Sequence, residues 1–369
     1  MNERTRNLFE DLLQTCVRLE ASDMHLSSGR PVSFRVHGRL KTYGNEILSG
    51  DTIGAMAQAV MTPDQQDEFE RRSTADIGYS GGNNTRFRIN VYMEMGQPAM
   101  AVRHLNQDLK GFEELGLPAG LKDLAFLPSG LVLVTGATGS GKSTTLAMLL
   151  DEINRSRACH ILTVEDPVEF VHKSAKSLIH HREVNTDVPG FAEAVRAALR
   201  EDPDVIMVGE MRDLETMQAS ITAAETGHLV FSTLHTGEAV GAIERFIGHF
   251  AREEQEVARH RMSMVLRAVI SQHLIPDMNN TGRVPAVEVL RVTNGAANLI
   301  RTSKARQLYS MMECGAKDGM WTLDQDLARL VKSGQVSRDT AMAFCANPEG
   351  FDRHVNAAGS RGGSPYECQ

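Results

Sequence analysis

The chain has 369 residues, a length that favours two domains because single hydrophobic cores tend to stop growing near about 250–300 residues. A net charge of −8 excludes the general basic field that draws proteins to nucleic acid. No apolar run approaches the roughly 18 residues of a membrane span. The charged, amphipathic N-terminus is unlike a secretory signal. Five scattered cysteines without C-x-x-C indicate neither a disulfide framework nor a zinc site, so we expect a cytoplasmic protein.

Residues 1–105 mix short helical and strand patterns. Apolar residues recur near helical spacing over 2–21, and 31–40 alternate apolar and polar residues around Gly38, as in a hairpin. Further expected elements are a helix over 52–71, strands over 75–79, 85–93 and 99–105, and a turn over 81–84. Without a phosphate loop of its own, this part of the chain is expected to be a small α+β domain.

Residues 106–120 carry turn formers and little periodicity, and we expect an interdomain linker there. From 121 to 355, apolar strand candidates alternate with helices, which predicts a mostly parallel sheet covered by helices, an α/β fold. The strand candidates are 131–135, 160–164, 205–209, 229–233 and 284–290. The Gly/Ser-rich tail, 356–369, is expected to be disordered.

One stretch carries the strongest chemical signal. The apolar run 131–134 leads into G-x-x-x-x-G-K-S over 136–143, which opens a helical pattern, as a phosphate-binding loop requires. Its glycines let successive N–H groups point into one concavity. The predicted ligands are ATP and Mg²⁺, and the expected contacts come from Thr138, Gly139, Ser140, Gly141, Lys142, Ser143 and Thr144. Lys142 would reach the β- and γ-phosphates and Ser143 would hold Mg²⁺.

A second signal is the apolar strand 204–209, which ends in Glu210. A carboxylate there lies beside the end of the phosphate-loop strand, where nucleotides sit in open α/β sheets. Glu210 is a candidate for holding Mg²⁺ or for orienting the attacking water. The alternative is a solvated acid after a buried strand.

Two more signals follow apolar strands. Pro167 ends one strand, and either Glu165 or Glu169 beside it can activate water. His228 precedes the strand 229–233 and His235 follows it, and we expect this histidine pair to act near the γ-phosphate. The alternative for each histidine is a structural role.

Four blocks in this order resemble the secretion-superfamily ATPases, and most of all the type IV pilus retraction ATPases of the PilT/PilU type. The blocks are GATGSGKSTTL (136–146), ILTVEDPVEF (161–170), REDPDVIMVGEMRDLET (200–216) and AAETGHLVFSTLHT (223–236). In that family they are the Walker A, Asp box, Walker B and His box. The likeness also covers ASDMHL (21–26), RFRIN (86–90) and WTLDQDL (321–327), so it leaves out little besides the tail.

The resemblance implies a PAS-like N-terminal domain, a RecA-like P-loop ATPase domain and a homohexamer. It implies an ATPase motor for pilus retraction and twitching motility, at the cytoplasmic face of the inner membrane. Implied partners are the inner-membrane pilus platform protein and, as an open alternative, a paralogous retraction ATPase. No nucleic-acid partner is expected.

The resemblance also assigns residues. Lys142 and Ser143 fall in the Walker A block, and Glu169 matches the Asp-box glutamate that activates water. The Walker B glutamate is Glu210, and the His-box pair is His228 and His235.

Two arginines complete the implied site. Arg88 and Arg103 match positions from which basic side chains reach the nucleotide when the domains close. A guanidinium there stabilises charge developing on phosphoryl oxygens. The alternative is a pair of surface arginines.

The sequence departs from the family in one block. Its AIRNLIRE motif, which is linked to retraction, reads GAANLIRT over 295–302, with Ala297 and Thr302 in place of an arginine and a glutamate. This favours an accessory, PilU-like motor or a divergent system. The four-cysteine zinc module of extension and type II secretion ATPases is missing, whereas a type IV secretion ATPase stays an open alternative.

Two other classes are less favoured. A nucleic-acid translocase would need basic or aromatic pore loops, and aromatic residues make up only 5% of this acidic chain. A scaffold that does not hydrolyse ATP would not need Lys142, Glu169 and Glu210 together.

Overall fold

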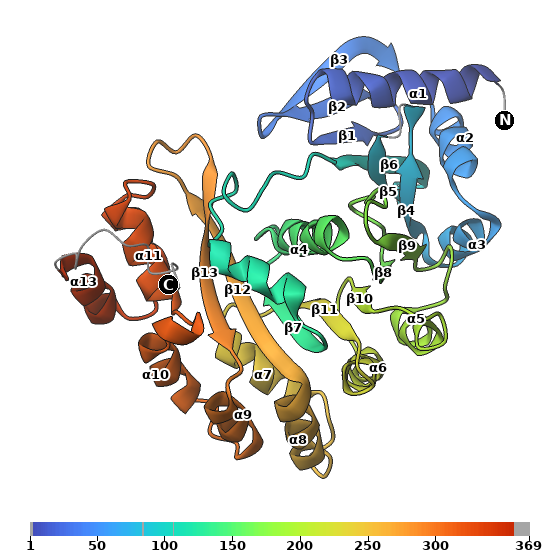
Figure 1. Cartoon of the computed structure of the whole chain (residues 1–369). Coiled ribbons are helices and arrows are strands. Elements are labelled where there is room, and N and C mark those ends of the chain that lie inside the picture. The colour runs from blue at the N-terminus through green and yellow to red at the C-terminus, as the bar shows by residue number, and fades with distance from the viewer. Residues whose placement is uncertain (1–2, 83–84, 106, 358–369) are drawn as a thin grey trace. The chain divides into compact units, whose positions relative to one another are not determined.

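Two sheets organise the chain in the computed structural model, which describes residues 3–82, 85–105 and 107–357 (Figure 1). Its contacts form two units. The first consists of residues 1–108, 164–172 and 181–190, and the second of 109–163, 173–180 and 191–369. The division therefore assigns two segments of the expected ATPase domain to the N-terminal unit. The expected tail, apart from residues 356–357, and part of the turn at 81–84 lie outside the described residues.

The first unit is built on an antiparallel sheet of order β3-β2-β1-β6-β5-β4. Its elements are α1 (Glu3–Arg18), β1 (Asp23–Leu26), β2 (Pro31–Val36), β3 (Arg39–Ile47), α2 (Gly50–Val60), α3 (Pro63–Arg72), β4 (Thr74–Ser80), β5 (Arg86–Glu94) and β6 (Gln97–Leu105). Alternate residues such as Met24, Phe34 and Ile89 are buried in one core with residues of α1 and α2, which is the period-2 pattern of a half-buried sheet. The predicted hairpin is confirmed, with His37 and Gly38 at positive φ between β2 and β3.

The expectation of one helix over 52–71 is wrong, because α2 ends at Val60 and α3 begins at Pro63. Proline lacks the N–H that a helix interior requires, but fits the first helical position. Thr62 and Gln65 form a capping box there: the Thr62 hydroxyl accepts from the Gln65 N–H at 3.3 Å and the Gln65 side chain accepts from the Thr62 N–H at 2.9 Å.

The second unit is built around a seven-stranded sheet of order β13-β12-β7-β11-β10-β8-β9. Its strands are β7 (Gly130–Thr135), β8 (His160–Glu165), β9 (Leu178–Glu183), β10 (Val205–Val208), β11 (Leu229–Leu234), β12 (Leu266–Pro276) and β13 (Arg283–Arg291). β12, β7, β11 and β10 run parallel, and β13 is antiparallel to β12. Every residue of β7 is buried, as expected of a central strand covered on both faces.

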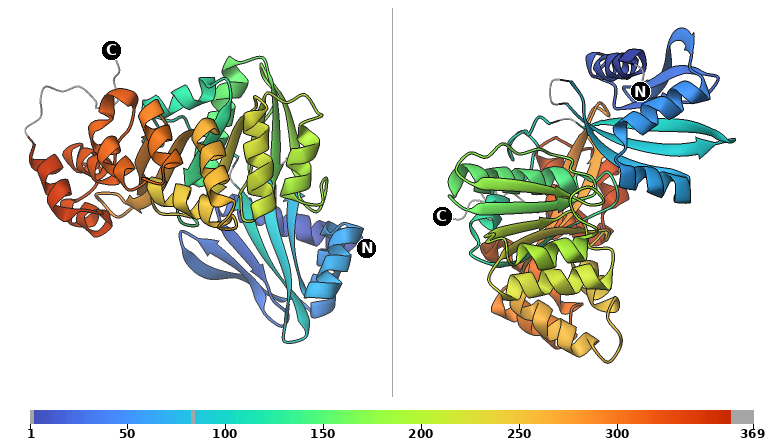
Figure 2. Two further views of the ribbon diagram at one scale, coloured as in Figure 1. Left: turned by 90° about the horizontal axis from the view of Figure 1, so that it is seen from below. Right: turned by 90° about the vertical axis from the view of Figure 1, so that its right-hand side faces the viewer.

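Helices cover both faces of this sheet. The α-helices are α4 (Lys142–Ser156), α5 (Phe191–Ala198), α6 (Leu214–Glu225), α7 (Ala239–Gly248), α8 (Gln255–Val265), α9 (Asn294–Arg301), α10 (Gln307–Cys314), α11 (Leu323–Lys332), α12 (Arg338–Phe344) and α13 (Pro348–Asn356), and the 3₁₀ segments are η2 (Ala119–Phe126) and η3 (Ala316–Asp318). Helices α4 and α6 both pack on β7 and β11, from opposite sides of the sheet (Figure 2). The predicted α/β fold class is confirmed.

Two strands of this sheet were not expected from the sequence. β12 begins at Leu266 directly after α8 ends at Val265, so no turn residue marks the change. β9 carries the polar sequence LIHHRE, which lacks a run of apolar residues.

The WTLDQDL block closes one edge of this sheet. The backbone of Trp321 pairs with that of Val289 in β13, and the Trp321 indole N–H donates to the carbonyl of Val287 at 2.9 Å. The buried Asp326 carboxylate accepts from the N–H of Val287 at 2.8 Å. These contacts satisfy backbone groups that an open edge strand would present to other chains.

Glu288 on β13 ties two helices to the sheet edge. Its side chain is 5% exposed and accepts from the backbone N–H of Ala239 at 2.7 Å and from that of Leu323, the first residues of α7 and α11. Burial raises the pKa of Glu288 to about 7 despite these hydrogen bonds, and the nearby carboxylates of Glu238 and Asp324 act in the same direction.

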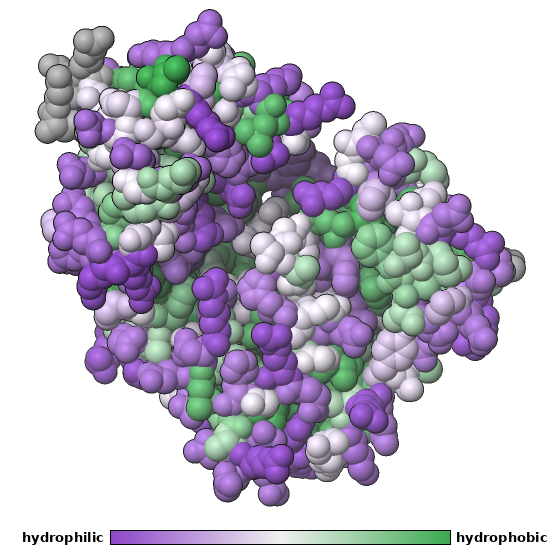
Figure 3. All heavy atoms as spheres, turned by 180° about the vertical axis from the view of Figure 1, so that it is seen from behind, coloured by the Kyte–Doolittle hydropathy of each residue, from purple (hydrophilic) through white to green (hydrophobic). Residues whose placement is uncertain are grey.

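Among the described residues, no helix is long and apolar enough to cross a membrane. Figure 3 shows a face on which hydrophilic side chains surround the apolar ones. The described cysteines, Cys16, Cys159, Cys314 and Cys345, are free thiols.

The Glu288→Gln variant tests the pKa of the buried carboxyl. Because the folded-state pKa is raised, the folded protein holds a proton that the unfolded chain releases above its ordinary pKa of about 4.3. Folding stability from this group is therefore present at low pH and is lost as pH rises through 7. The Tm of the wild type should fall between pH 5 and pH 8, and the Tm of Glu288→Gln should fall less over the same range. The exposed-site variant Glu256→Gln is the control, and equal losses in the wild type and Glu288→Gln would contradict the assignment.

Candidate nucleotide-binding site

The glycine loop joins the central strand to a helix. β7 ends at Thr135, and α4 begins at Lys142 after Gly141, which has φ 90°. Gly136 has φ 145°, and a Cβ there would lie 2.4 Å from the carbonyl oxygen of Gln272 and 2.4 Å from Ser140 Oγ. Only glycine fits both the backbone conformation and this close approach. The N-terminus of α4 therefore faces a loop shaped to receive an anion.

The polar groups of this loop and of the adjoining β11 segment fit a phosphate-bearing ligand. Lys142 is 8% exposed, and its ammonium donates to the carbonyls of Gly136 and Ala137 at 3.0 Å. The side-chain oxygens of Thr135, Ser140, Ser232 and Thr236 are buried without a hydrogen-bond partner in the described part of the chain. A buried hydroxyl without a partner is costly, and phosphate oxygens accept from such donors. Thr138, Gly139 and Ser143 are exposed and Thr144 is half-buried, so a ligand can reach them.

Gln272 on β12 supports the loop and was not expected from the sequence. It is 3% exposed, and its side-chain carbonyl accepts from the Thr145 hydroxyl at 2.7 Å. A Cβ at Gly141 would lie 2.7 Å from the side-chain nitrogen of Gln272, which is closer than a Cβ normally approaches another atom. The only indication in the sequence is a glutamine in the mainly apolar segment AVISQHL. That glutamine predicts a contact with the loop only if β12 is known to pair with β7.

Glu210 and His235 lie together at the same edge of the sheet. The strand register pairs Leu234 with Thr135, so His235 follows β11 at the level where the glycine loop begins. Glu210 Oε2 lies 3.3 Å from His235 Nε2 and 2.6 Å from Arg212 Nε. The Glu210 side chain is only 14% exposed, whereas Arg212, which the sequence did not single out, is 70% exposed. The arrangement gives a carboxylate flanked by two nitrogen donors beside the anion loop.

The expectation that both histidines lie near the γ-phosphate is corrected for His228. It precedes Leu229, which pairs with Gly130 at the start of β7, and its backbone carbonyl accepts from the Gly130 N–H at 3.0 Å. His228 therefore lies at the end of β11 opposite to the glycine loop. Its Nδ1 lies 2.9 Å from the carbonyl oxygen of Ala223 at the end of α6. The contacts that the structure shows for His228 are those of a structural residue.

Arg88 and Arg103 occur in the first unit, opposite each other on β5 and β6. Like charges directly across a strand pair are destabilising. Each has an acidic partner: Arg88 lies 3.3 Å from Asp76, and Arg103 lies 2.9 Å from Asp23. Burial raises the pKa of Asp23, but hydrogen bonds from Arg103 and Ser22 outweigh it and hold this pKa below its usual value. We call Arg88 and Arg103, opposite each other in the register and each paired with an aspartate, the cationic pair.

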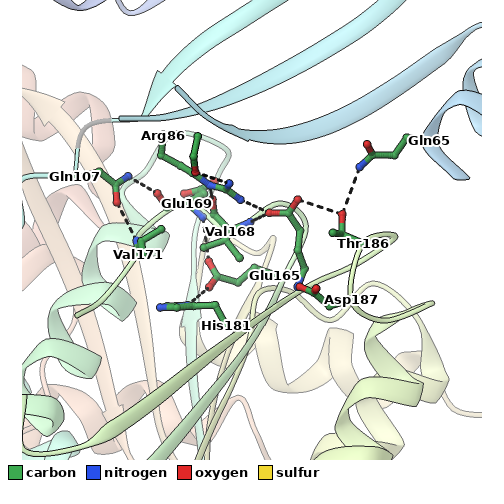
Figure 4. Close-up of polar contacts among 12 residues, drawn as sticks. Gln65, Arg86, Gln107, Glu165, Val168, Glu169, Val171, His181, Thr186 and Asp187 are labelled. Carbon is green, nitrogen blue, oxygen red and sulfur yellow. Dashed lines mark hydrogen bonds and ion pairs between the residues drawn. The ribbon is translucent and has the colours of Figure 1, made fainter. Parts of the chain in front are cut away.

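Glu165 and Glu169 also occur in the first unit, and their carboxylates have different surroundings (Figure 4). Glu165 is 7% exposed, and its Oε2 accepts from the backbone N–H of Glu169 at 3.2 Å. Its Oε1 lies 3.6 Å from His181 Nδ1. Glu169 is half-buried, and among the described residues no hydrogen bond or ion pair engages its carboxylate. The geometry favours Glu169 over Glu165 for work on a substrate.

A parallel sheet with a glycine loop between β7 and α4 defines a P-loop nucleotide-binding protein. The model of the family described as type II/IV secretion system protein matches residues 2–337, and the chain belongs to this family. It is 44% identical to the type IV pilus retraction ATPase PilT of Pseudomonas aeruginosa over 92% of this chain and 99% of the relative. Identity to the type IV pilus ATPase PilU of the same organism is 35%, over 91% and 88%.

Among solved structures, the chain resembles the pilus retraction motor PilT with bound ADP. The TM-score is 0.85 at 41% identity, and the match covers 93% of this chain and 98% of that one. The chain is therefore a member of the secretion and pilus ATPases, with PilT-type retraction ATPases among its close relatives.

Gly136→Ala tests the shape of the loop. The added Cβ would meet the Gln272 carbonyl oxygen and Ser140 Oγ, so the loop must move. We expect ATP affinity to fall at least about tenfold, or about 1.4 kcal/mol, in a fluorescent-nucleotide titration. Gly248→Ala, where the added Cβ meets nothing within 4 Å, is the control and should bind ATP like the wild type. Unchanged affinity in Gly136→Ala would contradict a phosphate site in this loop.

Proposed function

We propose that this chain hydrolyses ATP to drive retraction of type IV pili. The observation that carries the proposal is the position of Glu210 and His235, which follow β10 and β11 at the level of the glycine loop. The 44% identity with PilT over nearly the full length of both chains supports the coupling to pilus retraction.

Each residue has a proposed role at the phosphates. Lys142 binds the β- and γ-phosphates, and Glu169 activates the attacking water. Ser143 and Glu210 hold Mg²⁺, which when bound neutralises charge developing on the phosphoryl oxygens. His235 lies 3.3 Å from Glu210, and we assign it the orientation of that carboxylate.

The cationic pair of Arg88 and Arg103 has a separate role in the proposal. Their guanidinium groups stabilise the negative charge of the transition state when the first unit closes on the nucleotide. Opening then withdraws that charge after hydrolysis. In this proposal each arginine binds its aspartate in the open state and the phosphates in the closed state. The bound nucleotide therefore changes the conformation of the chain.

The proposed assembly is a homohexamer at the cytoplasmic face of the inner membrane, acting on the pilus platform protein. Residues 1–105 are the proposed N-terminal domain, 106–120 the linker, 121–355 the ATPase domain and 356–369 a disordered tail. A PilU-type paralogue is a further proposed partner, since PilU is itself a relative of this chain.

Glu210→Gln and Lys142→Ala separate binding from hydrolysis. Glu210→Gln keeps the side-chain size but loses the charge, so ATP should bind within about threefold of wild type while phosphate release falls at least about 100-fold, or about 2.7 kcal/mol in the barrier. Lys142→Ala should lose binding as well. Phosphate release and fluorescent-nucleotide titration of the full chain measure both effects. Normal turnover in Glu210→Gln would contradict its role.

An accessory, PilU-like role is the second candidate, and the GAANLIRT segment favours it. All but the last residue of this segment lie in α9, in which Ala296 and Ile300 are buried, and Thr302 is the exposed residue that follows the helix. The departures at Ala297 and Thr302 therefore leave the apolar face of the helix intact. Twitching in a host strain without its own retraction ATPases distinguishes the two roles: recovery with this chain alone supports the principal motor, and recovery only with a second ATPase supports the accessory role.

A further inference from the structure

The loop that carries Glu169 has an unusual support. Residues 166–171 belong to neither a helix nor a strand, so their backbone groups need other partners. Side chains supply them, and those side chains come from both the N-terminal sheet and the ends of β8 and β9 (Figure 4).

Arg86 and Glu183 hold the peptide groups of Val168. Glu183 Oε2 accepts from the Val168 N–H at 3.1 Å, and the Arg86 Nε donates to the Val168 carbonyl at 3.3 Å. Arg86 and Glu183 also form an ion pair with each other, and their side chains are 13% and 9% exposed. Such a shielded pair keeps its geometry better than an ion pair at the surface, because water competes less for either group.

Gln107 and Glu165 hold the next residue in the same way. Glu165 accepts from the Glu169 N–H, and the Gln107 side-chain nitrogen donates to the Glu169 carbonyl at 2.7 Å. The side-chain oxygen of Gln107 accepts from the Val171 N–H at 2.9 Å. Side chains thus bind both the N–H and the carbonyl of Glu169, and its carboxylate takes no part in these contacts.

Gly78 on β4 makes room for the ion pair. A Cβ at this position would lie 2.4 Å from Glu183 Oε2 and 2.5 Å from Arg86 Nη2. Its φ is not in the left-handed region, so alanine would suit the strand itself and would disturb only the pair.

We propose that Arg86 and Gln107 are positioning residues that fix Glu169 to the N-terminal sheet, so that the direction of its carboxylate follows the position of that sheet. Arg86 lies on β5, two residues before Arg88, and Gln107 follows β6, which carries Arg103. Movement of this sheet therefore carries the cationic pair and the water-activating carboxylate together. The proposal rests on the proposed role of Glu169 in hydrolysis.

Gln107→Ala and Gly78→Ala test the proposal in the full-length chain. Both should lower kcat for ATP hydrolysis at least about tenfold and leave KM within about twofold, because they misplace Glu169 without touching the phosphate loop. Arg86→Lys should lie between these variants and the wild type, since lysine keeps the charge but not the second hydrogen bond. Arg72→Ala, which removes an exposed ion pair with Glu68 on α3, is the matched control and should keep the wild-type kcat.

The Glu169→Gln background distinguishes positioning from general destabilisation. If Gln107 and Gly78 act through Glu169, their substitution in Glu169→Gln should cause no further loss of kcat. Wild-type turnover in Glu169→Gln alone would contradict the proposed role of Glu169. If Glu169→Gln is impaired but Gln107→Ala and Gly78→Ala keep the wild-type kcat, the positioning role is wrong. It is also wrong if the losses of kcat multiply in the double variants.

Discussion

The close approach of the glycine loop to β12 is the constraint on which the nucleotide site depends. Gly136 meets the backbone of Gln272, which leaves no room for a Cβ there, and Gly141 meets the Gln272 side chain and has φ 90°, a conformation that side chains rarely adopt. The pairing of β7 with β12 on one side and β11 on the other then fixes which residues reach the loop. His235 and Glu210 arrive there by strand register, and His228 is excluded by the same register.

Local sequence patterns predict the structural features that are set by residues adjacent in the chain. The strand β7, the glycine loop and the start of α4 are consecutive in the chain, and each was expected. The single helix expected over 52–71 failed for a local reason too, because Thr62 and Pro63 form a start signal inside the periodic pattern. The same two residues divide the periodic pattern into two helices.

Local sequence patterns do not predict contacts between segments that are far apart in the chain. Gln272 is 127 residues from Thr145, and Arg86 is 97 residues from Glu183, and neither pair has a motif that links its members. His228 shows a different error. It was expected near the γ-phosphate together with His235, but the two bracket β11 and so lie at opposite ends of it, and only the end that His235 follows lies at the level of the glycine loop. Which distant segments become neighbours depends on sheet order, and a single sequence does not determine sheet order.

The first unit combines features that a rigid scaffold would not need. Arg88 and Arg103 lie opposite each other in the strand register, each paired with an aspartate, and the Asp-box loop is attached by side chains where backbone pairing is absent. Both features suit the binding and hydrolysis of an anionic substrate. With the proposed roles of Glu169 and the cationic pair, the N-terminal sheet becomes part of the catalytic apparatus, where the sequence alone suggested only two arginines.

Live imaging of fluorescently labelled pili tests the central claim, that hydrolysis at this site retracts pili. The cells to compare carry the wild-type gene, no gene, or the gene with Glu210→Gln. If the claim holds, pili extend and retract in the first strain and extend without retracting in the other two. Normal retraction in cells with Glu210→Gln as the sole copy would contradict it.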